Sequence, residues 1–139
     1  MSHTSRSVAF STFGFLASFA VLTAYAAEDH WPRFRGPNGA GLSNATTVPV
    51  KWAEADYNWK VKLPGTGHSS PVIWGDRLFA TCSDKKTGRR TLVCLHAHHG
   101  KLLWQRNFTA KVHLQHQYNS FASTTPAVAD ANNYAAPRW

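Results

Sequence analysis

The sequence predicts an all-β fold of four-stranded antiparallel meanders, of which the chain holds about one and a half. Three observations favour this fold class. Beyond the first 27 residues, apolar runs are short and are bounded by Gly, Pro, Asn and Asp. No stretch there keeps the 3.6-residue period of a helix. The segment Ser70-Pro71-Val72-Ile73 also returns as Thr125-Pro126-Ala127-Val128, 55 residues later, which indicates an internal repeat.

Residues 1–26 predict a secretory signal peptide. Arg6 gives a positive start, the apolar stretch Val8–Tyr25 follows, and Ala24-Tyr25-Ala26 offers small residues for cleavage. The alternative is an uncleaved membrane anchor, because the stretch approaches the ~20 apolar residues that span a bilayer. We favour cleavage, which predicts a periplasmic or extracellular chain of residues 27–139 without a stable membrane span.

The exported chain is basic. Arg6 leaves with the signal, so 14 Lys and Arg oppose 7 Asp and Glu, for a net charge of +7. Its cations are scattered along the sequence, apart from Lys85 and Lys86 in an expected turn, whereas nucleic-acid recognition needs charge gathered on one face. We therefore expect no nucleic-acid partner and interpret the charge as an aid to solubility, with a weak attraction to acidic surfaces.

The first part of the exported chain predicts little regular pairing. Residues 31–49 are crowded with Gly, Pro and Asn, which is typical of a surface loop. Residues 50–63 predict an incomplete meander, with strands at Val50–Trp52 and Tyr57–Leu63. The second strand alternates apolar with polar residues, so one of its faces should meet water.

Residues 69–108 predict the best-defined meander. Gly75-Asp76 is a two-residue turn that favours a tight hairpin, and two longer polar turns complete the unit. The inner two runs lack polar alternation, which suits a sheet covered on both faces. The four expected strands are Ser70–Trp74, Arg77–Ser83, Thr91–His96 and Lys101–Phe108.

Residues 109–122 predict an inserted loop, and residues 123–139 the start of a further repeat. The 55-residue spacing is long, but removing about ten loop residues restores the usual ~40–50. Phe79-Ala80 also returns as Tyr134-Ala135 at the same spacing. The segment Ala129–Trp139 otherwise lacks strand-forming residues, so the tail indicates a truncated or frame-shifted product.

The segment Cys94-Leu95-His96-Ala97-His98-His99-Gly100-Lys101-Leu102-Leu103-Trp104 resembles the tryptophan-docking motif Ala-x-Asp-x-x-Thr-Gly-Lys-x-x-Trp. That motif belongs to the pyrroloquinoline-quinone-like (PQQ-like) β-propeller repeat family. Gly100, Lys101 and Trp104 match it, whereas Cys94, His96 and His99 replace its Ala, Asp and Thr. With WPRFRGPNGAGLS, GDRLFATCSD and NSFASTTPAV, the chain is similar to an N-terminal fragment of the exported planctomycete-type propellers.

The resemblance implies that each meander is a propeller blade. Gly100 would fit the turn, Lys101 would open the last strand, and Trp104 would wedge its indole between neighbouring blades. The departures at His96 and His99 remove the side chains by which the family locks adjacent blades together, so those hydrogen bonds are not expected here.

The histidines and cysteines suggest other chemistry. His96, His98 and His99 crowd one turn, and His113 with His116 forms a second pair, but neither has a ligand spaced to close a metal site. We therefore expect no metal. Cys82 and Cys94 lie on strands expected to be neighbours, so they form either a cross-strand disulfide or two buried free thiols.

Three functions remain open. We favour a non-catalytic exported propeller module for binding or scaffolding, with no cofactor and an unidentified protein or cell-envelope partner. An N-terminal piece of a PQQ-dependent dehydrogenase is the second, although the seven carboxylates form no cluster that could hold Ca²⁺. A non-functional gene fragment is the third, because a closed propeller needs about four to eight blades. Open strands at Ser70–Trp74 and Lys101–Phe108 favour self-association.

Overall fold

The computed structural model describes residues 30–129 and 134–135. The predicted signal peptide and most of the tail therefore lie outside the described residues. The described chain is mostly β, with the single 3-10 turn η1 at Glu54–Asp56 as its only helical element. Within the described ranges, no helix is long and apolar enough to cross a bilayer.

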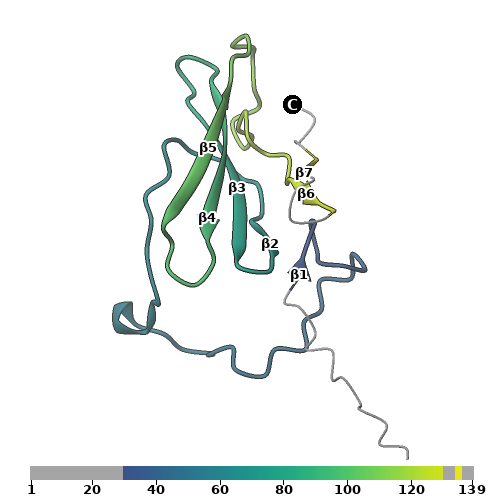
Figure 1. Ribbon diagram of the computed structural model, residues 1–139. Helices are drawn as coiled ribbons and strands as arrows, with labels where there is room; N and C mark the ends of the chain where they lie inside the picture. Colours follow the sequence, from purple (N-terminus) through teal and green to yellow (C-terminus); the bar gives the residue numbers. More distant parts are fainter. Residues whose placement is uncertain (1–29, 130–133, 136–139) are drawn as a thin grey trace, which may run out of the picture.

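Five strands form one open antiparallel sheet whose spatial order follows the chain (Figure 1). The four strands expected for residues 69–108 are confirmed, with ends that move by no more than two residues. Gly75 turns the chain between the first two of them with φ of 55°. The strands are β1 (His30–Trp31), β2 (Val72–Trp74), β3 (Arg77–Ser83), β4 (Arg90–His96) and β5 (Leu102–Phe108).

The two inner strands, β3 and β4, are buried along most of their length, as the absence of polar alternation predicted. Pairing of Phe79 with Cys94, and of Cys94 with Trp104, places these three residues on one face of the sheet. Leu78 pairs with Leu95, so both lie on the opposite face. The two faces of the sheet therefore present different side chains.

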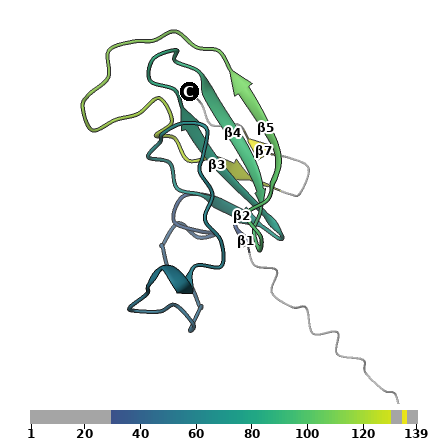
Figure 2. The same cartoon turned by 90° about the vertical axis from the view of Figure 1, so that its left-hand side faces the viewer.

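The first face holds the hydrophobic core. Phe79 and Cys94 lie there with Val72 and Leu92, and Val128 from the C-terminal part of the described chain packs against them. Val128 belongs to β6 (Ala127–Val128), which pairs with β7 (Tyr134–Ala135) in a separate two-stranded sheet. Residues from the second repeat thus cover the first (Figure 2).

The sequence repeat predicts a second hairpin equivalent to β2–β3, and the structure shows it in part. The backbone of Tyr134–Ala135 does pair with Ala127–Val128, although the surrounding tail lacks strand formers. The register is shifted by one residue, because Val72 pairs with Phe79 whereas Ala127 pairs with Ala135. The repeat in sequence therefore predicts the hairpin but not its pairing.

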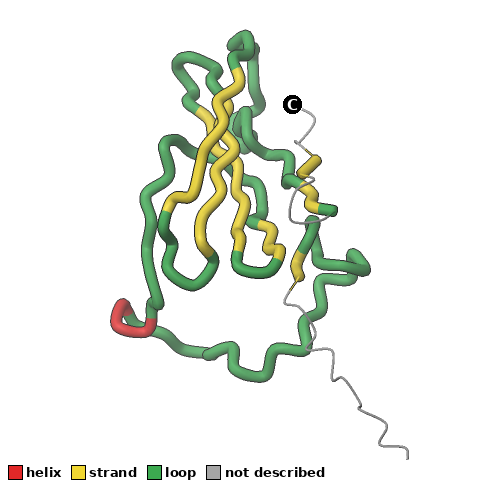
Figure 3. Tube along the Cα trace, viewed as in Figure 1, coloured by secondary structure: helices red, strands yellow, loops and turns green. Residues whose placement is uncertain are grey.

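The structure corrects the expectations for residues 31–63 and for the open edge at β2. His30–Trp31 forms β1 beside β2, so Trp31 is paired rather than in the surface loop, and β2 is not an open edge. Val50–Trp52 is not a strand, and Tyr57–Leu63 is extended without a strand partner among the described residues (Figure 3). A strand needs a neighbouring strand for its backbone hydrogen bonds, and apolar alternation alone does not supply one.

Candidate docking site at the β4–β5 turn

The turn between β4 and β5 is closed by its own backbone. The N–H of His96 donates to the carbonyl of Lys101 at 2.8 Å, and the N–H of Gly100 donates to the carbonyl of His96 at 2.8 Å. Gly100 has φ of 64°, in the left-handed region where a residue without Cβ is favoured. The turn therefore presents backbone without a side chain at Gly100, which is buried.

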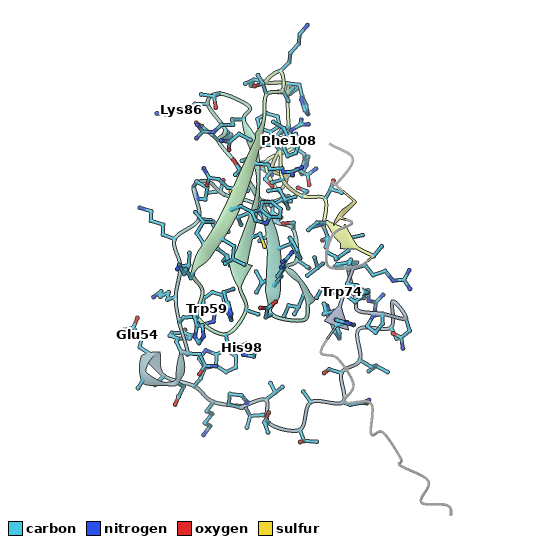
Figure 4. The ribbon with its side chains drawn as sticks, in the orientation of Figure 1. Glu54, Trp59, Trp74, Lys86, His98 and Phe108 are labelled. Carbon is cyan, nitrogen blue, oxygen red and sulfur yellow. The ribbon has the colours of Figure 1, made fainter. Side chains whose placement is uncertain are left out.

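The indole of Trp59 docks on this turn from 38 residues upstream (Figure 4). Its Nε1–H donates to the carbonyl of Ala97 at 2.8 Å. The ring lies against Gly100 so closely that a Cβ at this position would be 2.5 Å from Trp59 Cε3. Gly100 is therefore required twice, once by its backbone conformation and once by the indole above it.

Gly100 and Lys101 lie at the β4–β5 turn, whereas Trp104 lies away from it on β5. Gly100 forms the docking surface, and Lys101 precedes β5 and closes the turn with its carbonyl while its side chain is exposed. Trp104 lies on β5, where its ring is 5.9 Å from that of Phe79 and 5.6 Å from the Arg106 guanidinium. The structure therefore does not bring Trp104 onto Gly100.

Trp59 falls within the strand expected at Tyr57–Leu63, but the sequence did not predict its contact with Gly100. The signal was present, because Trp59-Lys60 precedes Pro71 much as Trp104-Gln105 precedes Pro126. The contact itself could not be read from this spacing, since it depends on how the extended segment crosses the sheet.

Imidazole rings contribute to the β4–β5 turn. His96 Nδ1 accepts the backbone N–H of His98 at 3.3 Å, so the neutral ring carries its proton on Nε2. That nitrogen lies 3.8 Å from Asp76 Oδ2 on the neighbouring β2–β3 turn. The ring of His99 stacks on His96 with centroids 4.6 Å apart.

The histidines of this turn contact one another and the turn backbone, and they do not form a metal site. Within the residues that the structure describes, no three His, Cys, Asp or Glu side chains are grouped so that they could hold a metal ion. His113 instead meets the Phe121 ring edge-on at 4.9 Å, and His116 Nδ1 accepts the Tyr118 N–H at 3.4 Å.

The two cysteines are free and buried, so of the two alternatives the structure has the pair of thiols and not the cross-strand disulfide. Cys82 pairs with Thr91 whereas Cys94 pairs with Phe79, three positions away along both strands. Because neighbouring residues of a strand point to opposite faces, this offset puts the two thiols on opposite sides of the sheet. Burial raises the pKa of Cys94 to about 11 and also raises that of Cys82.

A hollow of about 260 Å³ lies beside the docked indole, between residues 59–71 and the second face of the sheet. Its lining is mainly apolar and includes Trp59, Val61, Leu63, Leu78 and Leu95, with Ser69 and Thr81 as its polar members. None of the lining side chains titrates near neutral pH, so the hollow offers an apolar surface rather than an acid, a base or a metal ligand.

No protein-family model matches the chain, and neither a curated protein nor a solved structure is significantly similar to it.

Proposed function

We propose that the chain is a non-catalytic, exported repeat module of the PQQ-like β-propeller type, whose meander serves as a binding or scaffolding blade. The docking of Trp59 on the β4–β5 turn carries this proposal. The resemblance implies an indole wedged between successive blades, and an indole from the upstream segment lies against Gly100 and donates to Ala97.

The burial of the meander gives independent support. Propeller blades are covered on both faces by their neighbours. Here the downstream repeat places Val128 on one face of β3 and β4, and the upstream segment places Trp59 over the other. Covering of both faces of the sheet is what a blade would need, and this supports the proposal.

A pair of tryptophan variants tests the docking. Trp59→Phe keeps an aromatic ring but removes the N–H that reaches Ala97, which should lower the free energy of unfolding by about 1 kcal/mol. Trp52→Phe is the matched control, because Trp52 is 62 % exposed, and should leave stability unchanged. Urea unfolding of both variants measures the difference, and equal stabilities would remove the main support for a blade.

A quinone assay separates this module from a quinone-dependent dehydrogenase. The described residues offer no grouped carboxylates for Ca²⁺. We expect the secreted chain, mixed with PQQ and Ca²⁺, to give no dye-linked oxidation of alcohols or sugars above the rate of free PQQ. Saturable, protein-dependent turnover would assign the chain to the dehydrogenase class instead.

A further inference from the structure

The end of the sheet opposite the docked indole joins two segments that are separate in sequence. The β3–β4 turn, residues 84–89, packs on the loop that follows β5, residues 109–120. A Cβ on Gly88 would lie 2.6 Å from the carbonyl oxygen of Ala110 and 3.1 Å from Val112 Cγ2. Figure 1 shows both segments at one end of the molecule, and we call them together the basic tip.

Four exposed cations meet at the basic tip: Lys85, Lys86, Arg89 and Lys111. Three of them lie within five residues of the β3–β4 turn, and the fold brings Lys111 beside that turn, since Gly88 lies against its neighbours Ala110 and Val112. Asp84 is the one carboxylate on these two segments, and its Oδ1 accepts the N–H of Lys86 at 2.9 Å. That hydrogen bond holds the pKa of Asp84 below its ordinary value, but a single charge cannot balance four.

Apolar side chains project from the same loop. Leu114 is 99 % exposed, and Val112 and Tyr118 on either side of it are also largely exposed. Single exposed apolar residues are common on protein surfaces. A fully exposed leucine between an aromatic side chain and a cluster of uncompensated cations is the combination found on proteins that bind the interface of an anionic bilayer.

We propose that the basic tip docks the exported chain on an anionic phospholipid bilayer surface, with the cations at the headgroups and Leu114 inserted among the acyl chains. The positive charge of the basic tip favours an anionic surface. The exposed Leu114 favours a bilayer over a soluble polyanion, because a polyanion offers no apolar region in which a leucine could be buried. The loop's outward reach in Figure 2 leaves this surface clear of the sheet. The proposal does not depend on the assignment as a propeller blade.

Vesicle co-sedimentation of the secreted chain tests the proposal. We expect binding to phosphatidylcholine vesicles that contain about one-third phosphatidylglycerol, and little binding to phosphatidylcholine alone. Each cation near an anionic surface contributes about fivefold to partitioning, so Lys85→Glu/Lys86→Glu should weaken binding at least about 25-fold. Raising the salt from ~0.1 M to ~1 M should abolish binding, because the screening length falls from ~10 Å to ~3 Å.

Two matched control variants change exposed residues outside the basic tip. Lys51→Glu/Lys62→Glu changes the net charge equally on exposed residues away from the basic tip, and should leave most of the binding intact. Leu114→Ser should weaken binding about tenfold, the scale of burying one leucine. Val50→Ser, at a residue that is 97 % exposed, should not.

Three results would overturn the proposal. Absence of binding to the anionic vesicles would do so directly. Equal losses in the two double-charge variants would mean attraction by net charge alone. If Leu114→Ser bound as tightly as the unaltered chain while the basic-tip charges still mattered, the site would recognise a soluble polyanion rather than a bilayer. Circular dichroism of each variant verifies that the sheet is intact.

Discussion

The backbone N–H of Ser70 donates to the side-chain oxygen of Thr125 at 3.0 Å, and these two residues occupy equivalent positions of the internal repeat. The two repeats thus contact each other through the first residue of the repeated segment. Neighbouring bonds strengthen this contact, since the N–H groups of His68 and Ser69 both donate to the carbonyl of Ala122 at 3.1 Å.

Thr125→Val should destabilise the chain. Valine keeps the shape of threonine but removes the acceptor for Ser70, and a partly buried donor without a partner costs about 1–3 kcal/mol. Thr47→Val, in an exposed loop, is the control and should change stability little. Urea unfolding monitored by circular dichroism compares them, and equal midpoints would show that the repeat contact contributes nothing.

Gly100→Ala should destabilise more than Gly75→Ala. Both glycines have positive φ, so alanine at either position incurs backbone strain of about 1 kcal/mol. At Gly75 nothing lies within 4 Å of the added Cβ, whereas at Gly100 the Trp59 ring must move. The difference, about 1–3 kcal/mol by the usual cost of overpacking, isolates the indole contact in thermal or urea unfolding. Similar losses in both variants would place Trp59 elsewhere in solution.

Local patterns predicted the meander well, because each of its features is set by neighbouring residues. The Gly75-Asp76 turn and the unbroken apolar run of β3 specify a hairpin without reference to distant parts of the chain. The pairing of β1 with β2 could not be predicted, since a two-residue strand carries no periodicity. The docking of Trp59 depends on a path through residues 59–71 that no local pattern describes.

The pairing register of Cys82 and Cys94 is a second feature that local sequence could not predict. Sequence placed Cys82 and Cys94 on adjacent strands correctly, but the length of the turn between them left the register open. A bridge requires opposed residues with a Cα separation below ~7 Å, and only the observed pairing excludes it.

The buried thiols should make the chain less stable in alkali. The pKa of Cys94 is raised from 9.0 to about 11, so the folded thiol keeps its proton where the unfolded one loses it. Stability is therefore full below pH 9.0 and falls as the pH rises toward about 11. Urea midpoints across this range measure the decline, and Cys94→Ala should flatten it.

The same burial predicts the chemistry of the thiols. Both cysteines should resist a disulfide-exchange reagent in the folded chain at pH 8 and react fully after unfolding. Fewer than two reactive thiols in denaturant without reductant would indicate a bridge and contradict the register.

The chain should self-associate through β5, the longer of the two edge strands of the five-stranded sheet. Leu102 and Leu103 are exposed there, and an exposed apolar edge strand pairs readily with another copy. Leu103→Lys should shift association to higher concentration, whereas Val50→Lys, in an exposed loop, should not. Sedimentation velocity over a concentration series provides the comparison, and a monomer at every concentration would contradict the expectation.

The order of strands in the sheet also sets an order of folding in time. From β2 to β5 each strand pairs with the next along the chain, so the hairpins of residues 72–108 close short loops and should form early. The contact of Trp59 with Ala97 and that of Ser70 with Thr125 span 38 and 55 residues and should form later. During folding, the meander would then assemble first, and the contacts of Trp59 and Thr125 would form afterwards. Mutations in the β3–β4 hairpin should therefore slow refolding, while Trp59→Phe should mainly speed unfolding.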